Sequence, residues 1–157
     1  MTSPRARTIR RAIVAMLSLV FPLACDDGPT GPRPIADSYD LLSIGSGGGL
    51  PGTIPLPGGA LIRVTSGTLT MRTDSTFELR LQATRDSGGV SVPLPAVAAS
   101  GRYTAARMLG DDLYDYTLGF SGTGTMPGAG GLLGSDGFLS VDGFVIAGVP
   151  VGASFEH

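Results

Sequence analysis

The sequence of 157 residues lacks lysine, asparagine and tryptophan and has a single cysteine, Cys25, and a single histidine, His157. A base at the end of a chain is poorly held, and Cys25 lies in a leader-like segment described below. Ser–His–Asp and Cys–His catalysis and zinc sites of Cys and His are therefore disfavoured. We expect a protein that is not an enzyme and that has no cofactor and no catalytic or metal site.

Long helical patterns are also missing. All 25 glycines and ten of the twelve prolines follow Cys25, and no stretch there repeats apolar residues with a period of 3.6. Both residue types oppose helix formation, so the composition favours an all-β fold.

The N-terminus has the pattern of an export signal. Arg5, Arg7, Arg10 and Arg11 precede an apolar run over residues 12–24, and no acidic residue occurs before Asp26. This run spans about 20 Å as a helix, short of the roughly 30 Å of a bilayer core. We predict a signal peptide over residues 1–24.

Cys25 ends the segment Phe21-Pro22-Leu23-Ala24-Cys25, which resembles a bacterial lipobox except that Pro22 replaces the usual leucine three residues before the cysteine. We predict that Cys25 carries the lipid and becomes the first mature residue. The alternative is a plain secretory signal cut near Ala24. Two or three acyl chains hold a protein firmly on a membrane, so the prediction is a lipid-anchored protein of the cell envelope, with the choice of membrane open.

Cleavage after residue 24 would leave seven arginines and thirteen acidic residues, a net charge of −6. This balance, without a cluster of basic residues, disfavours nucleic acid as a partner. Residues 25–37 are rich in proline and glycine and are predicted to be a tether that begins at the lipidated Cys25. Residues 38–157 are long enough for one domain with a single core.

This domain alternates apolar and polar residues with a period of two. The alternation over residues 67–73 and 77–83, around Asp74-Ser75, predicts an antiparallel hairpin with one wet face. Residues 90–97 contain Pro93 and Pro95 and are expected to form an edge strand or a loop. Further predicted strands begin at residue 102, cover 114–120 and 151–155, and form a hairpin of 138–141 with 144–147 around Asp142-Gly143.

Roughly eight short strands fit a small antiparallel up-and-down barrel or a sandwich. We favour the barrel because sequential hairpins dominate and because closure removes exposed sheet edges.

Several short motifs follow one another in a familiar order. They are Tyr39-x-Leu41-x-x-Ile44, Ser66-Gly67-x-Leu69-x-Met71-x-x-Asp74-x-Thr76-Phe77, Gly101-x-Tyr103, Gly137-x-Leu139 and Asp142-Gly143-Phe144. Together they resemble small lipocalin-like β-barrel lipoproteins of environmental bacteria. The resemblance implies a secreted or anchored barrel whose relatives mostly have no assigned ligand.

Three features of the sequence are candidate binding sites. Phe77, Leu79, Tyr114, Tyr116 and Phe120 form a hypothetical wall of a ligand cavity, although small barrels are more often filled by such side chains. Asp111, Asp112 and Asp115 offer oxygen ligands for Ca²⁺ but lack the spacing of a calcium loop, so a turn is favoured. The glycine-rich residues 119–137 suggest a lid over the barrel or a long loop.

Two functions remain open. The first is an anchored barrel of undefined role that binds a small apolar or amphiphilic ligand. The alternative is a structural or protein-interaction module of the envelope whose barrel is filled and ligand-free, with its protein partners open.

Overall fold

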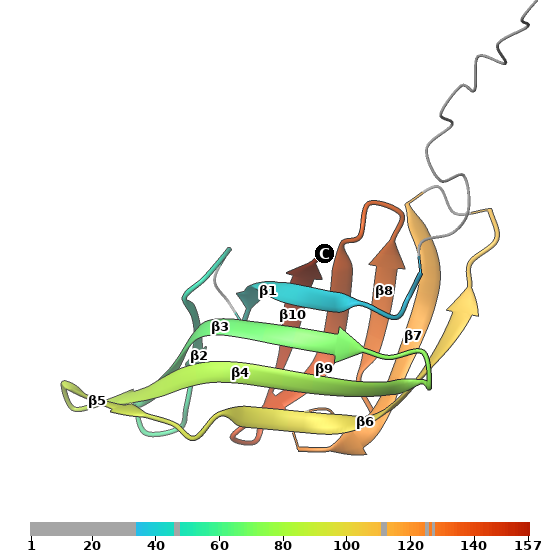
Figure 1. Cartoon of the computed structure of the whole chain (residues 1–157). Helices are drawn as coiled ribbons and strands as arrows, with labels where there is room; N and C mark the ends of the chain where they lie inside the picture. The colour runs from blue at the N-terminus through green and yellow to red at the C-terminus, as the bar shows by residue number, and fades with distance from the viewer. Residues whose placement is uncertain (1–33, 46–47, 111–112, 125, 127) are drawn as a thin grey trace, which may run out of the picture. The chain divides into compact units, whose positions relative to one another are not determined.

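A computed structural model describes residues 34–157 except 46–47, 111–112, 125 and 127 (Figure 1). The predicted signal peptide, Cys25 and most of the tether lie outside the described residues. Every regular element found among the described residues is a β-strand. The strands are β1 (Ser38–Ile44), β2 (Gly52–Pro55), β3 (Leu61–Met71), β4 (Thr76–Ser87), β5 (Val90–Pro93), β6 (Val97–Arg107), β7 (Tyr114–Thr123), β8 (Gly130–Gly134), β9 (Leu139–Ile146) and β10 (Val149–Glu156).

The strands form one antiparallel sheet that closes into a barrel. Its order is β2-β3-β1-β10-β9-β8-β7-β6-β4-β5, and an additional pairing of β3 with β4 joins the two sides. The closed ring therefore contains eight strands, β1, β3, β4 and β6 to β10. Each of them pairs with the next strand in this list, and β10 pairs with β1. The predicted all-β antiparallel barrel is confirmed.

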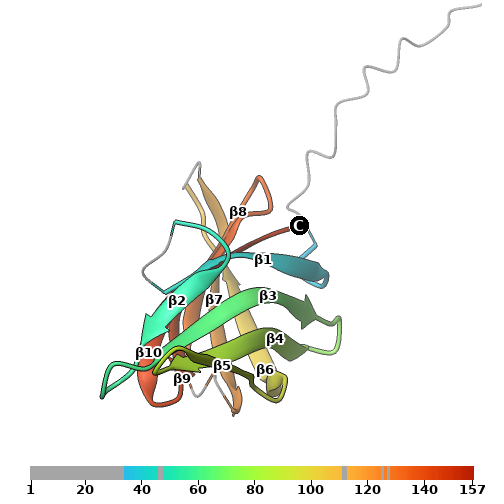
Figure 2. The same cartoon turned by 90° about the vertical axis from the view of Figure 1, so that its left-hand side faces the viewer.

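The remaining two strands widen the sheet beyond the ring. β3 and β4 pair from Leu61 with Asp86 to Met71 with Phe77, which makes them the longest hairpin described. The outer half of this hairpin carries β2 along β3 and β5 along β4. We call the four-stranded unit β2-β3-β4-β5 the extension; its outer part reaches away from the ring on the left of Figure 1 and faces the viewer in Figure 2.

Alternate residues of the ring strands point inward and form one hydrophobic core. In β4, for example, Phe77, Leu79, Leu81 and Ala83 are buried while the residues between them face outward. The largest fully buried side chains are Tyr39, Phe77, Phe144, Phe155, Ile44, Ile54, Leu69, Met71, Leu79, Leu81, Met126 and Leu133. The period-two pattern of the sequence is thus the inside–outside alternation of a barrel wall.

The hairpin predicted around Asp142-Gly143 is wrong. Both residues lie within β9, where Val141 pairs with Ala153 and Phe144 with Val151, so two residues of β9 oppose Gly152 alone. This is a β-bulge, and Gly143 adopts a positive φ of 90°, which glycine takes without strain. The turn to β10 comes later, at Ala147 and Gly148, whose φ angles are 50° and 82°.

Two other proline- or glycine-rich segments also form strands. Residues 90–93 are β5, which pairs with β4 as the predicted edge strand. The segment 119–137, which suggested a lid or a loop, instead contains the end of β7 and the whole of β8. Glycines are compatible with β8 because the ladders to β7 and β9 satisfy its backbone on both sides.

The two ends of the barrel differ. At one end, which we call the entry end, the described chain enters β1, and the connections β3–β4, β6–β7 and β8–β9 lie there by strand register. Asp37 is fixed at this end, since its carbonyl accepts a hydrogen bond from Met71 N at 2.8 Å and its carboxylate lies 2.6 Å from His157 Nε2. The extension and the β9–β10 turn lie at the other end.

Candidate functional site

Three of the five residues predicted to line a ligand cavity lie in the packed core. Phe77, Leu79 and Phe120 are exposed by 1%, 0% and 3% and belong to one continuous cluster of buried side chains. The rings of Phe77 and Phe120 meet edge to face, with centroids 5.3 Å apart. These residues contact one another as core side chains do.

The two predicted tyrosines lie at the margin of this core. Tyr114 and Tyr116 are half-buried near the entry end of β7, and Tyr116 packs against the core. A register shift between them separates the pairing of Tyr114 with Gly134 from that of Tyr116 with Leu133. The expected single face over residues 114–120 is therefore interrupted at Asp115, and the structure gathers only its inner part, Leu118 and Phe120, in the buried interior.

The acidic cluster is only partly described, because Asp111 and Asp112 lie outside the described residues. Asp115 is half-buried, and its carbonyl accepts a hydrogen bond from Met108 N at 2.9 Å. Within the described ranges, no three His, Cys, Asp or Glu side chains gather closely enough to hold a metal ion.

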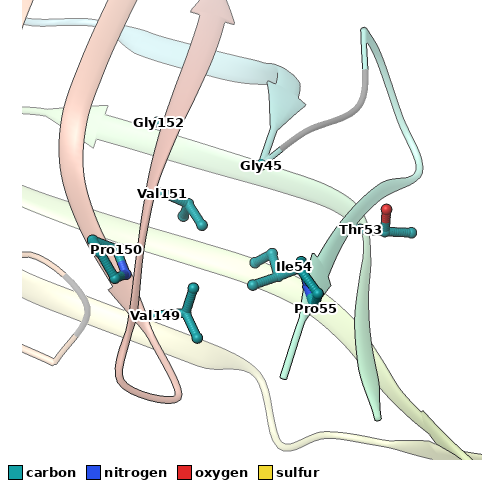
Figure 3. A pocket seen from close by; sticks show the side chains of 8 residues that line it. All are labelled: Gly45, Thr53, Ile54, Pro55, Val149, Pro150, Val151 and Gly152. Carbon is teal, nitrogen blue, oxygen red and sulfur yellow. The ribbon is translucent and has the colours of Figure 1, made fainter. Parts of the chain in front are cut away.

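A separate apolar cleft opens on the surface between β2 and β10 (Figure 3). Its volume is about 370 Å³, within the range of small-molecule sites. It is lined by Gly45, Thr53, Ile54, Pro55, Val149, Pro150, Val151 and Gly152. Ile54 from one side and Val149 and Val151 from the other point toward one another, whereas Thr53 points away.

Glycines bring the two walls of this cleft together. A Cβ atom at Gly52 would lie 2.3 Å from the carbonyl oxygen of Ile44, and one at Gly45 would lie 2.7 Å from that of Thr53. These approaches allow β2 to cross close to the end of β1, where Gly45 N also donates to Gly152 O at 3.0 Å. The tight β9–β10 turn then sets Val149 opposite β2.

The side chains that line the cleft are largely apolar, and backbone groups supply the polar part of its surface. None of its eight lining residues has an ionisable side chain, and its one side-chain hydroxyl belongs to Thr53. Ile54 is fully buried at its base, whereas Val149 and Val151 are half-buried. An apolar group that covers the two valines would remove their exposed surface from water.

A cluster of three charged side chains lies on the outer wall of the barrel. Glu78 accepts hydrogen bonds from Arg72 Nη2 at 2.9 Å and from Arg80 Nε at 2.6 Å. These bonds, the one from Arg72 first, lower the pKa of the Glu78 carboxyl below its ordinary value. Exposed ion pairs of this kind contribute little to stability, and their mutual satisfaction gives no sign of a reactive group.

Sequence reasoning missed the cleft because its two sides are distant in the chain. Ile54 lies in the glycine-rich stretch 45–59, where the sequence predicts no strand, and Val149 and Pro150 precede the predicted last strand over residues 151–155. The repeated apolar residues Ile54 and Leu56 between prolines were the available signal for a short strand.

No helix able to cross a membrane occurs among the residues that the structure describes.

Comparisons of this chain with protein-family models, with curated proteins and with solved structures gave no match.

Proposed function

We propose that this chain is a lipoprotein of the cell envelope, anchored at Cys25, whose barrel binds a small apolar or amphiphilic ligand in the cleft between β2 and β10. The observation that carries the binding proposal is the cleft itself, about 370 Å³ in volume and faced by Ile54, Val149 and Val151. An apolar chain or ring of a ligand fits this lining, and its polar group would stay at the open, solvent side.

The envelope location is supported by the sequence. The arginine-rich start, the apolar run of 13 residues and the lipobox-like segment before Cys25 form a consistent export and lipidation signal. The order of motifs that resembles small lipocalin-like lipoproteins supports the same assignment.

The binding site proposed here is not the wall predicted from the sequence. Phe77, Leu79 and Phe120 fill the core, so a ligand that entered among them would have to displace packed side chains. The surface cleft requires no such displacement. We therefore place the ligand outside the ring.

The packed core also favours a second candidate, a ligand-free barrel that acts as a structural or protein-interaction module. In that case the cleft would receive an apolar side chain of an envelope protein, and no small molecule would copurify. The two candidates differ in what remains bound to the purified protein.

Native mass spectrometry of the full chain, purified in mild detergent from the envelopes of its own host, tests this proposal. We expect a reproducible small-molecule adduct on the wild-type protein. The double variant Val149→Asp/Val151→Asp places charges in the cleft and should lose most of the adduct. The control is Val90→Asp/Val92→Asp, which changes two exposed valines of β5, away from the cleft, and should keep it.

Circular dichroism of both double variants establishes that the barrel has folded. Equal adduct on the cleft variant and the wild type would place the ligand elsewhere. Absence of an adduct from the wild type would favour the ligand-free module.

A further inference from the structure

The two most exposed large apolar side chains of the described residues, Leu109 and Leu113, lie at the entry end of the barrel. Leu109 is 86% exposed and Leu113 is 71% exposed in the β6–β7 connection, and Phe138 is 37% exposed in the β8–β9 connection. Both connections rise on the same side as the start of β1 and the C-terminus in Figures 1 and 2. Clustered apolar exposure of this kind marks a contact surface.

Backbone hydrogen bonds join the two connections that carry these residues. Ser135 N donates to the carbonyl oxygen of Leu113 at 3.4 Å, which joins the two connections. Gly134 N donates to Phe138 O at 2.7 Å, and Met108 N donates to Asp115 O at 2.9 Å, so each connection is closed at its base. We call Leu109, Leu113 and Phe138 the apolar tip.

The short tether, which joins the barrel at the entry end, indicates which surface the apolar tip contacts. Ile35 is already held on the barrel, because its carbonyl accepts a hydrogen bond from the buried Tyr39 hydroxyl at 3.0 Å. Ten residue steps separate it from Cys25, which is at most about 35 Å of extended chain. A lipid at Cys25 therefore keeps the entry end near the bilayer, at an effective concentration where weak contacts become populated.

We propose that the apolar tip rests on the membrane that holds the lipid anchor, with the entry end facing the bilayer and the extension facing away. This proposal rests on the anchor at Cys25 that is part of the proposed function. Leucine and phenylalanine side chains enter the boundary between headgroups and acyl chains favourably. The orientation leaves the cleft, at the opposite end, accessible to solvent.

The net charge of the chain indicates which membrane surface, neutral or anionic, the apolar tip would contact. Residues 25–157 have a net charge of −6, and Asp111 and Asp112 lie between the two leucines in sequence. An anionic surface would repel a chain of this charge, so the tip should contact neutral lipid in preference to anionic lipid.

The absence of tryptophan from the chain gives a direct test. Leu113→Trp introduces a single indole at the tip, and Val92→Trp introduces one at an exposed site on the extension. Both full-length lipidated proteins are placed in phosphatidylcholine vesicles whose acyl chains are brominated near the headgroup. We expect quenching of the Leu113→Trp indole to exceed that of the Val92→Trp indole by about twofold or more, since bromine quenches only at close range.

A second substitution tests the contribution of the tip. Leu109→Ser in the Leu113→Trp protein should reduce the quenching, whereas Val90→Ser in the Val92→Trp protein should leave it unchanged. Vesicles containing phosphatidylglycerol should give weaker quenching of the Leu113→Trp indole than neutral vesicles. Equal quenching at both indoles, or stronger quenching at Val92→Trp, would overturn the proposed orientation.

Separate measurements distinguish a wrong orientation of the barrel from a missing lipid anchor. Flotation with the vesicles and the mass of the Cys25 segment report the anchor independently of tip contact. A protein that floats and carries the lipid, but shows no excess quenching at Leu113→Trp, contradicts the orientation alone. A protein without the lipid contradicts the proposed function and, with it, the basis of the orientation.

Discussion

The ring of Phe77 on β4 meets the ring of Phe120 on β7 edge to face, with centroids 5.3 Å apart and an angle of 86° between their planes. The two strands are separated in the sheet by β6, and Phe77 pairs with Gly101 of that strand, so the two rings meet over β6 on the inner face of the wall. Both side chains are at least 97% buried. Two residues proposed from sequence to border a ligand thus border each other.

Replacement of either phenylalanine should destabilise the barrel. We expect Phe77→Ala or Phe120→Ala to lower the free energy of unfolding by about 3–5 kcal/mol, because each leaves a cavity in the core. Urea denaturation of the two single variants and the double variant should give a coupling of about 0.5–1.5 kcal/mol for the ring pair. The control Phe138→Ala, at an exposed phenylalanine, should cost less than about 1 kcal/mol. A loss that small for the core variants would contradict a packed interior.

Gly101 should be required where it pairs with Gly122, because the backbones of β6 and β7 approach closely there. A Cβ atom at Gly101 would lie 2.1 Å from the Ser121 carbonyl oxygen and 2.5 Å from Gly122 Cα. Gly101→Ala should therefore destabilise the protein by about 1–3 kcal/mol, since backbone must shift. Gly130→Ala in β8, where the nearest atom would be 3.9 Å away, is the matched control and should be near neutral. Similar stabilities of the two variants in urea would refute this close approach.

Tyr103 should make stability depend on alkaline pH. Its hydroxyl donates to Arg72 O at 2.7 Å, and burial, followed by the charge of Asp74, raises its pKa above 10.0. The contribution of Tyr103 to the free energy of unfolding is fully present below pH 10, where the phenol is neutral in the unfolded chain as well. It is lost as the pH rises through the raised folded value, because the unfolded state ionises first.

Tyr103→Phe should accordingly cost about 1 kcal/mol at neutral pH, from the lost hydrogen bond. The difference from the wild type should then narrow as the pH rises above 10. Urea midpoints at neutral and alkaline pH measure both quantities, and a gap that stays constant would argue against the raised pKa.

Glu78 should act in the opposite pH range. Its pKa lies below 4.5 in the folded protein because Arg72 and Arg80 donate to its carboxylate. Its contribution is present above pH 4.5 and is lost as the pH falls through the lower folded value. We expect Glu78→Gln to be slightly less stable than the wild type at pH 7 in thermal unfolding, with the difference shrinking as the pH falls below 4.5 and through the lower folded pKa. Salt at 1 M should also remove most of it, and a difference insensitive to both pH and salt would rule out an ionic origin.

The barrel could be predicted from sequence because its inside–outside alternation is a local property. Leu69 and Met71, then Phe77, Leu79 and Leu81, lie on the buried face as their spacing indicated. The same reasoning failed at Asp142-Gly143, because this dipeptide fits both a tight turn and a bulge with a positive φ. Only the neighbouring strands decide between these two structures.

The cleft could not be predicted because it depends on contacts between distant segments. Its walls come from Ile54 and from Val149 and Val151, about one hundred residues apart, and their separation follows from the glycine contacts at Gly45 and Gly52. The predicted wall failed to identify this place because inward-facing aromatic residues look alike whether a barrel is hollow or filled. The filling depends on the volumes of side chains from all eight strands together.

The most direct test of the central claim is the intact mass of the mature protein purified from the envelopes of its host. The account predicts a chain that begins at Cys25 and carries a diacylglyceryl-type adduct on that residue. An unmodified chain, whether cut near Ala24 or left uncleaved, would contradict the lipid anchor.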